Sequence, residues 1–325
     1  MAMKTVFIIN PKAGKGEKSE AFAKQVKETI ESAKADASVY ITKAVGDATE
    51  YVREHCEKHG AARFIACGGD GTLSEVLNGA VGFDDAEIGV VPSGTGNDFC
   101  RNFGKDIDFH NILHQLDGKT VKCDAIRYET LLDGMKKEGY CVNMFNIGFD
   151  CNVADMTADM KKVPFVSGFL AYFASIFVAL VKKKCSNLKI ELDGEVKHDG
   201  KLLLTSLANG CFCGGGIKSN PLAEVNDGLI NINIIKNVPR LRFISLLPYY
   251  MKGTVLELKN IDRYITSQKC RKVTVTPVCG KNIRLCVDGE IIDAGRTEFE
   301  IVHNAFNFVL PCESTFVKAN AEAMV

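Results

Sequence analysis

Short apolar runs alternate with amphipathic stretches over the first 122 residues of the chain. The apolar runs have the continuous hydrophobicity of strands buried on both faces; they cover residues 4–10, 37–42, 62–68 and 87–92. The stretches between them have apolar residues at helical spacing; they cover residues 19–35, 47–60 and 72–80, with a shorter helix over 97–104. This alternation predicts an α/β domain with a Rossmann-like parallel sheet.

The pattern changes after about residue 121. Strand-like segments joined by turns now follow one another, over residues 121–129, 139–150, 186–194, 201–210, 227–236, 271–277, 282–292 and 297–311. Helical patterns interrupt them at 153–183 and 240–252. We expect a C-terminal antiparallel β-sandwich with inserted helices. The predicted domains are residues 1–122 and 123–311, with a cleft between them and with the tail 312–325 packing back on the first.

Composition narrows the class of protein. The 40 basic residues balance the 40 acidic ones, which argues against a nucleic-acid partner. The 13 cysteines are scattered, and the close pair Cys211 and Cys213 lacks zinc-ligand spacing. Residues 1–10 have no signal-peptide pattern. Together these features predict a cytoplasmic protein with reduced thiols.

One segment raises the question of a membrane. Residues 164–184, "PFVSGFLAYFASIFVALVKKK", are apolar and end in three lysines. The apolar part reaches only the lower limit of about 17 residues for a spanning helix. A buried helix that lines a groove, a helix on the bilayer surface and a true span all remain open, and we expect at most peripheral association.

The stretch "FIACGGDGTLSEVLNG" carries the first chemical signal. Gly68, Gly69 and Gly71 follow an apolar strand and precede a helix, for which Thr72 and Glu75 fit a capping box with Thr72 as N-cap. Bare N–H groups ahead of a helix N-terminus bind phosphate. Asp70 would repel a polyphosphate unless Mg²⁺ lies between them.

Two further loops follow parallel strands. "INPKAGKG" begins at residue 9, and "VVPSGTGNDFCRNFG" begins at residue 90 and includes Asp98. Loops that follow parallel strands share the carboxyl edge of the sheet, where ligands bind. Neither has the Walker spacing of glycines and lysine. Three glycine-rich loops at one edge predict a nucleotide-phosphate site.

"INPKAGKG", "GGDGTLSEVLNG" and "PSGTGNDF" resemble, in this order, the catalytic domain of the diacylglycerol kinase family, which includes soluble bacterial lipid kinases and the sphingosine and ceramide kinases. The resemblance continues through "NIGFDCNVA", "PLAEVNDGLININII" and "LCVDGEII" and so covers nearly the whole chain. It implies a fold of the NAD-kinase and diacylglycerol-kinase type, ATP as phosphoryl donor and Mg²⁺ as cofactor.

The resemblance also implies roles for residues. Those implied to contact ATP are Asn10, Pro11, Lys12, Ala13, Gly14, Thr42, Gly68, Gly69, Asp70, Gly71, Thr72, Leu73, Ser74 and Thr95. Asp70 and Asp98 are implied to organise catalytic Mg²⁺, and Glu290 to act as general base with Asp288 beside it. A structural Mg²⁺ in the sandwich is implied for Asp227 and for the backbone carbonyls of Leu229 and, by position only, Glu224.

The residues of "LCVDGEII" also allow a plainer interpretation. Asp-Gly between apolar residues is the strongest short hairpin signal, so Asp288 and Gly289 could form only a turn. Phosphoryl transfer to an alcohol, however, needs a carboxylate near the hydroxyl. Glu290, brought across the cleft by the second domain, would supply that base.

We therefore expect an ATP-dependent lipid kinase that phosphorylates the hydroxyl of a lipid such as diacylglycerol, giving phosphatidic acid. A kinase for a soluble substrate, similar to NAD kinase, and a non-catalytic nucleotide-binding regulator are the alternatives. The apolar and basic segments at 164–184 and 240–253 suggest transient contact with a membrane surface. An exposed strand edge could support a homodimer. The sequence does not identify the lipid.

Overall fold

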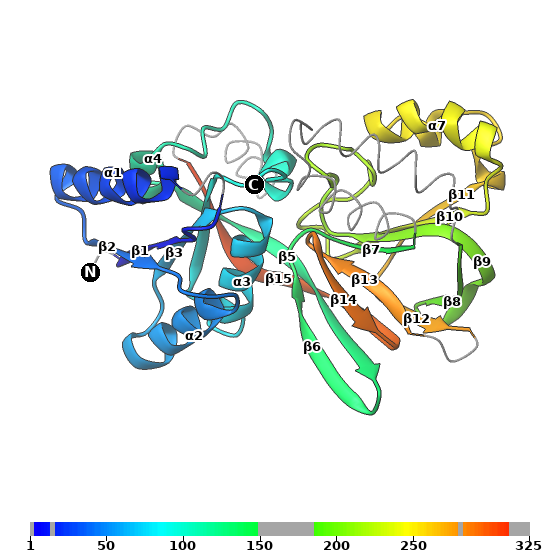
Figure 1. Ribbon diagram of the computed structural model, residues 1–325, viewed down its shortest axis with the longest axis horizontal. Coiled ribbons are helices and arrows are strands. Elements are labelled where there is room, and N and C mark those ends of the chain that lie inside the picture. The colour runs from blue at the N-terminus through cyan, green and yellow to red at the C-terminus, as the bar shows by residue number, and fades with distance from the viewer. Residues whose placement is uncertain (1–2, 14–16, 149–184, 279–281, 312–325) are drawn as a thin grey trace, which may run out of the picture.

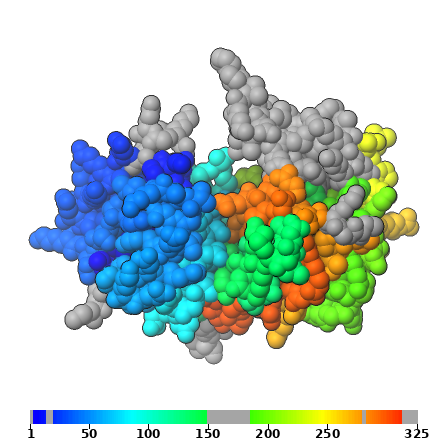
Figure 2. Space-filling view, turned by 60° about the horizontal axis from the view of Figure 1, so that its bottom comes forward, coloured from blue at the N-terminus to red at the C-terminus, as the bar shows by residue number. Residues whose placement is uncertain are grey.

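The computed structural model describes residues 3–13, 17–148, 185–278 and 282–311. An α/β domain and a β-rich domain lie side by side, and the long strands β5 and β15 run between them (Figure 1). On the face shown in Figure 2, the orange surface of the β13–β14 hairpin borders the blue and cyan surface of the α/β domain. Because the two domains are in contact here, residues of both can contribute to a functional site at this interface.

The α/β domain confirms the predicted alternation. Its parallel strands lie in the order β4-β3-β1-β2, and their bounds are β1 Thr5–Ile9, β2 Ala37–Ile41, β3 Arg63–Gly68 and β4 Glu87–Pro92. Its helices are α1 Glu17–Ala33, α2 Asp47–His59, α3 Asp70–Ala80, the 3₁₀ helix η1 Phe99–Phe103, and α4 Ile112–Leu116, which the sequence analysis did not predict. Strands β1, β3 and β4 are almost wholly buried, which explains their unbroken apolar runs.

The β-rich domain is the predicted antiparallel sandwich. Its strands are β6 Met135–Cys141, β7 Met144–Gly148, β8 Ser186–Leu192, β9 Glu195–Ala208, β10 Ile230–Lys236, β11 Ile265–Cys270, β12 Lys272–Pro277, β13 Ile283–Val287 and β14 Glu290–Ala294. All the pairings among them are antiparallel. The predicted helix at 240–252 is α7 Arg240–Lys252, followed by the 3₁₀ turns η2 Val255–Glu257 and η3 Ile261–Arg263.

Two long strands belong to both domains. β5 (Lys119–Leu132) and β15 (Arg296–Leu310) pair antiparallel along nearly their whole length, with a register shift between Val302 and Phe306. Before the shift β15 pairs with β12, and after it β15 pairs in parallel with β4. Phe306 and Phe308 pack in the core of the α/β domain. The expected boundary at residues 122 and 123 therefore falls inside β5, and the end of β15 completes the first domain.

Several expectations concern residues outside the described ones. These are the apolar segment 164–184, the helix at 153–183 and the tail 312–325. Among the described residues, no helix has the length and hydrophobicity needed to cross a bilayer. The described cysteines are free thiols and most are buried, as the sequence predicts.

Candidate active site

Loops from three neighbouring strands meet at the carboxyl edge of the parallel sheet. They follow β1, β3 and β4. The Asn10 side-chain amide donates a hydrogen bond to Thr72 Oγ1 at 3.1 Å, and the Ser93 N–H donates to the Gly68 carbonyl at 2.8 Å. The three predicted phosphate loops are thus joined into one surface.

Helix α3 begins earlier than predicted. It starts at Asp70, with Gly69 as N-cap and no side-chain capping bond, so Thr72 lies in the first turn. Glu75 does not bond back to the cap, because its carboxylate accepts a hydrogen bond from the Ala48 N–H at 3.3 Å. The predicted capping box is therefore wrong. No side chain caps α3, but the Thr72 and Leu73 N–H groups already donate to the Gly69 carbonyl, so an anion would have to bind to the N–H groups ahead of them.

The other residues predicted to contact ATP differ in how accessible they are to a ligand. Pro11, Lys12, Ala13, Ser74 and Thr95 are at least partly accessible, and Gly14 lies outside the described residues. Leu73 is 1 % exposed and its N–H bonds to the Gly69 carbonyl, so it offers a ligand no free donor. The Thr42 N–H bonds to the Ile9 carbonyl at 2.9 Å, which ties the end of β2 to the same edge.

Glycines allow these loops to approach one another. A Cβ on Gly69 would lie 3.2 Å from Gly94 Cα. A Cβ on Gly96 would lie 2.6 Å from Asp70 Oδ2 and 3.2 Å from Asp98 Oδ2. Glycine is required at these positions by the neighbouring loop, in addition to any demand from a ligand.

Asp70, which is partly buried, and Asp98, which is buried, form an acidic pair beside Gly96. Asp70 Oδ1 accepts the Asp98 N–H at 2.8 Å. Burial raises the pKa of Asp70, partly offset by backbone N–H groups. Burial, with a further contribution from the Asp70 charge, raises the pKa of Asp98 to about 6. Among the described residues, the cation paired with Asp98 is Arg101, at 3.5 Å. The pair therefore carries more negative charge than the described side chains balance.

Such a pair suits a divalent cation. Mg²⁺ is usually held by one or two carboxylates together with substrate phosphates, not by a complete cage of protein ligands. Among the described residues no group of three or more His, Cys, Asp or Glu side chains could hold a metal by itself. The two carboxylates, next to the N-terminus of α3, fit the part of a magnesium site that requires a bound nucleotide to complete it.

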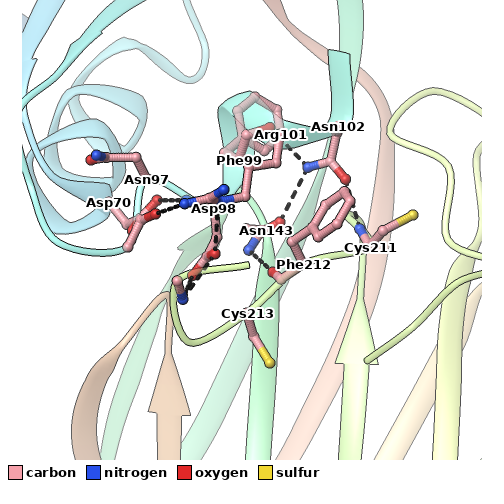
Figure 3. A network of polar contacts seen from close by, with 12 residues as sticks. Asp70, Asn97, Asp98, Phe99, Arg101, Asn102, Asn143, Cys211, Phe212 and Cys213 are labelled. Atoms are coloured by element: carbon pink, nitrogen blue, oxygen red, sulfur yellow. Dashed lines mark hydrogen bonds and ion pairs between the residues drawn. The ribbon is translucent and has the colours of Figure 1, made fainter. Parts of the chain in front are cut away.

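The sandwich domain reaches Asp98 through the loop between β9 and β10. The Gly215 N–H donates to both carboxylate oxygens of Asp98, at 3.1 and 3.0 Å (Figure 3). One turn further along η1, Asn102 Oδ1 accepts the Cys211 N–H at 2.7 Å. Asn143, which precedes β7, donates to the Phe212 carbonyl at 2.8 Å. Two side chains of the α/β domain thus hold the backbone of one loop of the sandwich.

Asp288 is a positioning residue in the hairpin between β13 and β14. It is 8 % exposed and has a φ of 47°, as the predicted Asp-Gly turn requires. Its carboxylate accepts N–H groups from Val142, Asn143 and Met144 at 2.9–3.1 Å, and the Cys141 thiol at 3.0 Å. The hairpin prediction is confirmed. These four bonds direct the Asp288 carboxylate toward the backbone that joins β6 and β7, and the role implied for Asp288 beside Glu290 stays a prediction.

Glu290 begins β14 and faces the α/β domain. A Cβ on Gly71 would lie 3.1 Å from Glu290 Oε1, so this carboxylate lies close to the first turn of α3, where glycine leaves room for it. Partial desolvation raises the pKa of Glu290, and the charges of Glu75 and Asp288 raise it further. Glu290, Asp70 and Asp98 therefore converge from both domains on the N-terminus of one helix.

The residues predicted to hold a structural metal are placed differently. Asp227 and Glu224 both contact the Lys269 ammonium, at 2.6 and 2.7 Å. The Leu229 N–H donates to the remaining oxygen of Asp227 at 3.0 Å. The Asp227 carboxylate, the one side chain of the expected magnesium site, thus already has a cation as partner.

Sequence reasoning missed the residues that join the domains. Asn102, Asn143 and Gly215 occur in no recognised motif. The available signals were a polar Asn inside the apolar run "CVNMF" and the three successive glycines of "CFCGGG". Buried polar residues and consecutive glycines both indicate close backbone contact.

A glycine-loop α/β domain joined to a β-sandwich is the two-domain architecture of the diacylglycerol kinase and NAD kinase folds. Comparison with known proteins specifies the family. The diacylglycerol kinase catalytic domain matches residues 4–128, and the YegS C-terminal NAD kinase beta sandwich-like domain matches residues 143–310. The chain belongs to the diacylglycerol kinase catalytic-domain family.

Individual relatives agree with this assignment. The chain is 30% identical over 316 residues to a diacylglycerol kinase of Bacillus subtilis, covering 94% of this chain and 96% of that one. It is 32% identical over 298 residues to a diacylglycerol kinase of Staphylococcus aureus, covering 89% and 87%.

Solved structures show the same fold. A diacylglycerol kinase of Bacillus anthracis superposes with a TM-score of 0.69 at 20% identity, covering 96% of this chain and 98% of that one. Yeast NADH kinase superposes with a TM-score of 0.53 at 14% identity, covering 100% and 88%. At these identities the comparison establishes the architecture and no more.

Proposed function

We propose that this protein is an ATP-dependent lipid kinase that transfers the γ-phosphate of ATP to the hydroxyl of a lipid such as diacylglycerol, giving phosphatidic acid. One observation carries the proposal. Glu290 of the sandwich lies against Gly71, at the helix N-terminus where Asp70 and the glycine loops would receive the phosphates of ATP. A base and a phosphate site thereby face each other across the domain interface.

Each group has a part in this chemistry. The N–H groups at the start of α3 would bind phosphate oxygens. Asp70 and Asp98 would hold Mg²⁺, which when bound neutralises charge on the phosphates. Glu290 would accept the proton of the lipid hydroxyl. The pKa of Glu290 is raised toward neutral pH, and a general base is most effective when its pKa lies near the pH at which it works.

Two observations favour a lipid acceptor. The relatives at about 30% identity are named diacylglycerol kinases. Helix α7 exposes apolar side chains, with Leu241 84% and Ile244 51% exposed, beside the basic residues Arg240 and Arg242. An exposed apolar and basic helix suits transient contact with a membrane surface.

A panel of acceptors tests the proposal. The protein is incubated with γ-labelled ATP, Mg²⁺ and micelles of diacylglycerol, monoacylglycerol, phosphatidylglycerol or a sphingoid base, with NAD as a soluble acceptor. We expect label in the lipid extract, migrating as phosphatidic acid when diacylglycerol is supplied. Label transferred to NAD alone would support a soluble-substrate kinase. Binding of ATP without transfer to any acceptor would support a regulator.

Asn102 provides a test of the domain contact. Asn102→Leu removes the acceptor for the Cys211 N–H, and we expect kcat to fall about tenfold or more because small displacements of reacting groups reduce rate steeply. ATP affinity, measured by calorimetry, should stay unchanged. Asn102→Asp keeps the acceptor and should recover most of the rate. Equal losses in both variants would contradict a positioning role for this bond.

A further inference from the structure

The turn "NDGL" joins the loop after β9 to strand β10 and is held from two sides. Gly228, with a φ of +71°, donates its N–H to the buried Asp124 carboxylate at 2.7 Å. Asp124 also accepts the Asn304 N–H at 2.7 Å, at the register shift of β15. On the other side, Asp227 and Glu224 contact Lys269. The turn thus lies between the β15 irregularity and strand β11.

Backbone pairing fixes the position of Lys269. β11 pairs antiparallel with β10, and Lys269 lies opposite Asn231, two residues after Leu229. The Lys269 ammonium therefore starts from a strand adjacent to the turn. Its side chain is 29% exposed and that of Asp227 is 18% exposed, so this is a partly shielded ion pair. Burial opposes the charge of Lys269, but its hydrogen bonds to Asp227 and Glu224 outweigh this and raise its pKa.

A magnesium ion does not fit these side chains. Mg²⁺ requires oxygen ligands at about 2.0–2.1 Å in near-octahedral geometry. Asp227 Oδ1 already accepts the Leu229 N–H at 3.0 Å, and Oδ2 lies 2.6 Å from the ammonium. A divalent cation on either oxygen would lie close to a fixed positive charge.

We propose that the Lys269 ammonium is the built-in counter-ion of this turn and takes the place of a structural divalent cation. The inference concerns this chain's own residues and is independent of the proposed substrate. This counter-ion affects the loop that ends in the turn. The loop that carries Gly215 and Cys211 to the active site ends in this turn, so Lys269 keeps that loop in place without metal.

Thermal unfolding without nucleotide tests the proposal. The Tm of the wild-type protein should be the same in EDTA and in millimolar Mg²⁺. Any rise of the Tm with Mg²⁺ that persists in Asp227→Asn arises at another site and does not count against the proposal. Lys269→Met should lower the Tm in EDTA by about 1–2 °C, the shift expected for roughly 1 kcal/mol in a chain of this length. Lys269→Arg keeps the charge and should show little change.

The Lys269→Met variant should also gain a response to metal. With the ammonium removed, the two carboxylates are free, and millimolar Mg²⁺ should restore much of the lost Tm. The double variant Lys269→Met with Asp227→Asn should not respond. A wild-type Tm that rises with Mg²⁺, and loses this rise in Asp227→Asn, would overturn the proposal. That measurement stands even if Lys269→Met fails to fold, and it leaves the lipid-kinase proposal unaffected.

Discussion

Glu290→Gln is expected to lower kcat by about 10²–10⁴-fold while ATP affinity stays near that of the wild type. The substitution keeps the shape of the side chain and removes the base. In the proposed reaction the acceptor is a neutral alcohol whose proton must leave as the new bond to phosphorus forms. Because Glu290 reaches Gly71 from the opposite domain, its loss should affect the transfer step and spare the phosphate loops.

Steady-state kinetics and calorimetric ATP titration of the purified variant provide the measurement, with circular dichroism as the check on folding. Glu300→Gln is a matched control, since Glu300 is an exposed residue in β15, away from the helix N-terminus. If Glu290→Gln kept more than about a tenth of the wild-type kcat, the residue would not be the general base. The "VDGE" segment would then be only a hairpin.

The strands of the α/β domain were predictable because burial on both faces leaves a clear pattern. The runs "TVFII" in β1 and "EIGVVP" in β4 contain almost no polar residue. Strand β11, "ITSQKC", was missed for the opposite reason. Among the described strands it pairs with β10 alone, and its half-exposed edge position gives it the polar sequence that is typical of a loop.

The domain boundary depends on packing that local patterns do not encode. β15 reads as one strand, yet a register shift near Asn304 sends its last residues into the first domain. The start of α3 is a similar case. Thr72 and Glu75 fit a capping box in sequence, but Asn10 and Ala48 from other segments bond to them instead.

Part of the site could be found from the sequence. Asp70, Asp98 and Glu290 occur in motifs whose glycines mark close approach, and the structure brings all three to one helix N-terminus. Asn102 and Lys269 could not be found in this way. Their roles depend on partners about 109 and 42 residues away, which only the folded chain places beside them.

Asp98→Asn is expected to make the protein more stable at pH 7 while removing at least 99% of its kinase activity. Asp98 is 6% exposed and lies beside Asp70, so its charged form is costly in the folded state. Asn can still accept the Gly215 N–H and adds a donor near Asp70. Activity should be lost because the asparagine no longer offers a carboxylate to Mg²⁺.

The pH dependence of the Tm distinguishes this explanation from a stabilisation that does not depend on the ionisation of Asp98. The pKa of Asp98 is about 6 in the folded protein, against 3.8 for an aspartate carboxyl in its ordinary state. A carboxyl whose pKa is higher in the folded than in the unfolded protein stabilises the fold at pH values below its pKa in the unfolded protein. This stabilisation is lost as the pH rises through its pKa in the folded protein. The loss by pH 7 is about 3 kcal/mol, and Asp98→Asn should avoid it.

Thermal unfolding in EDTA, from pH 4 to pH 8, is the measurement. We expect Asp98→Asn to raise the Tm by about 5 °C at pH 7 and by almost nothing at pH 4, where the wild-type carboxyl is protonated in the folded protein. Asp108→Asn serves as control, since Asp108 is exposed and away from the acidic pair. A variant that is less stable than wild type at pH 7 would show that the contacts that depend on the Asp98 charge, with Arg101 and with the Gly215 N–H, outweigh the cost of burying that charge. A gain of equal size at both pH values would show that it does not arise from ionisation of Asp98.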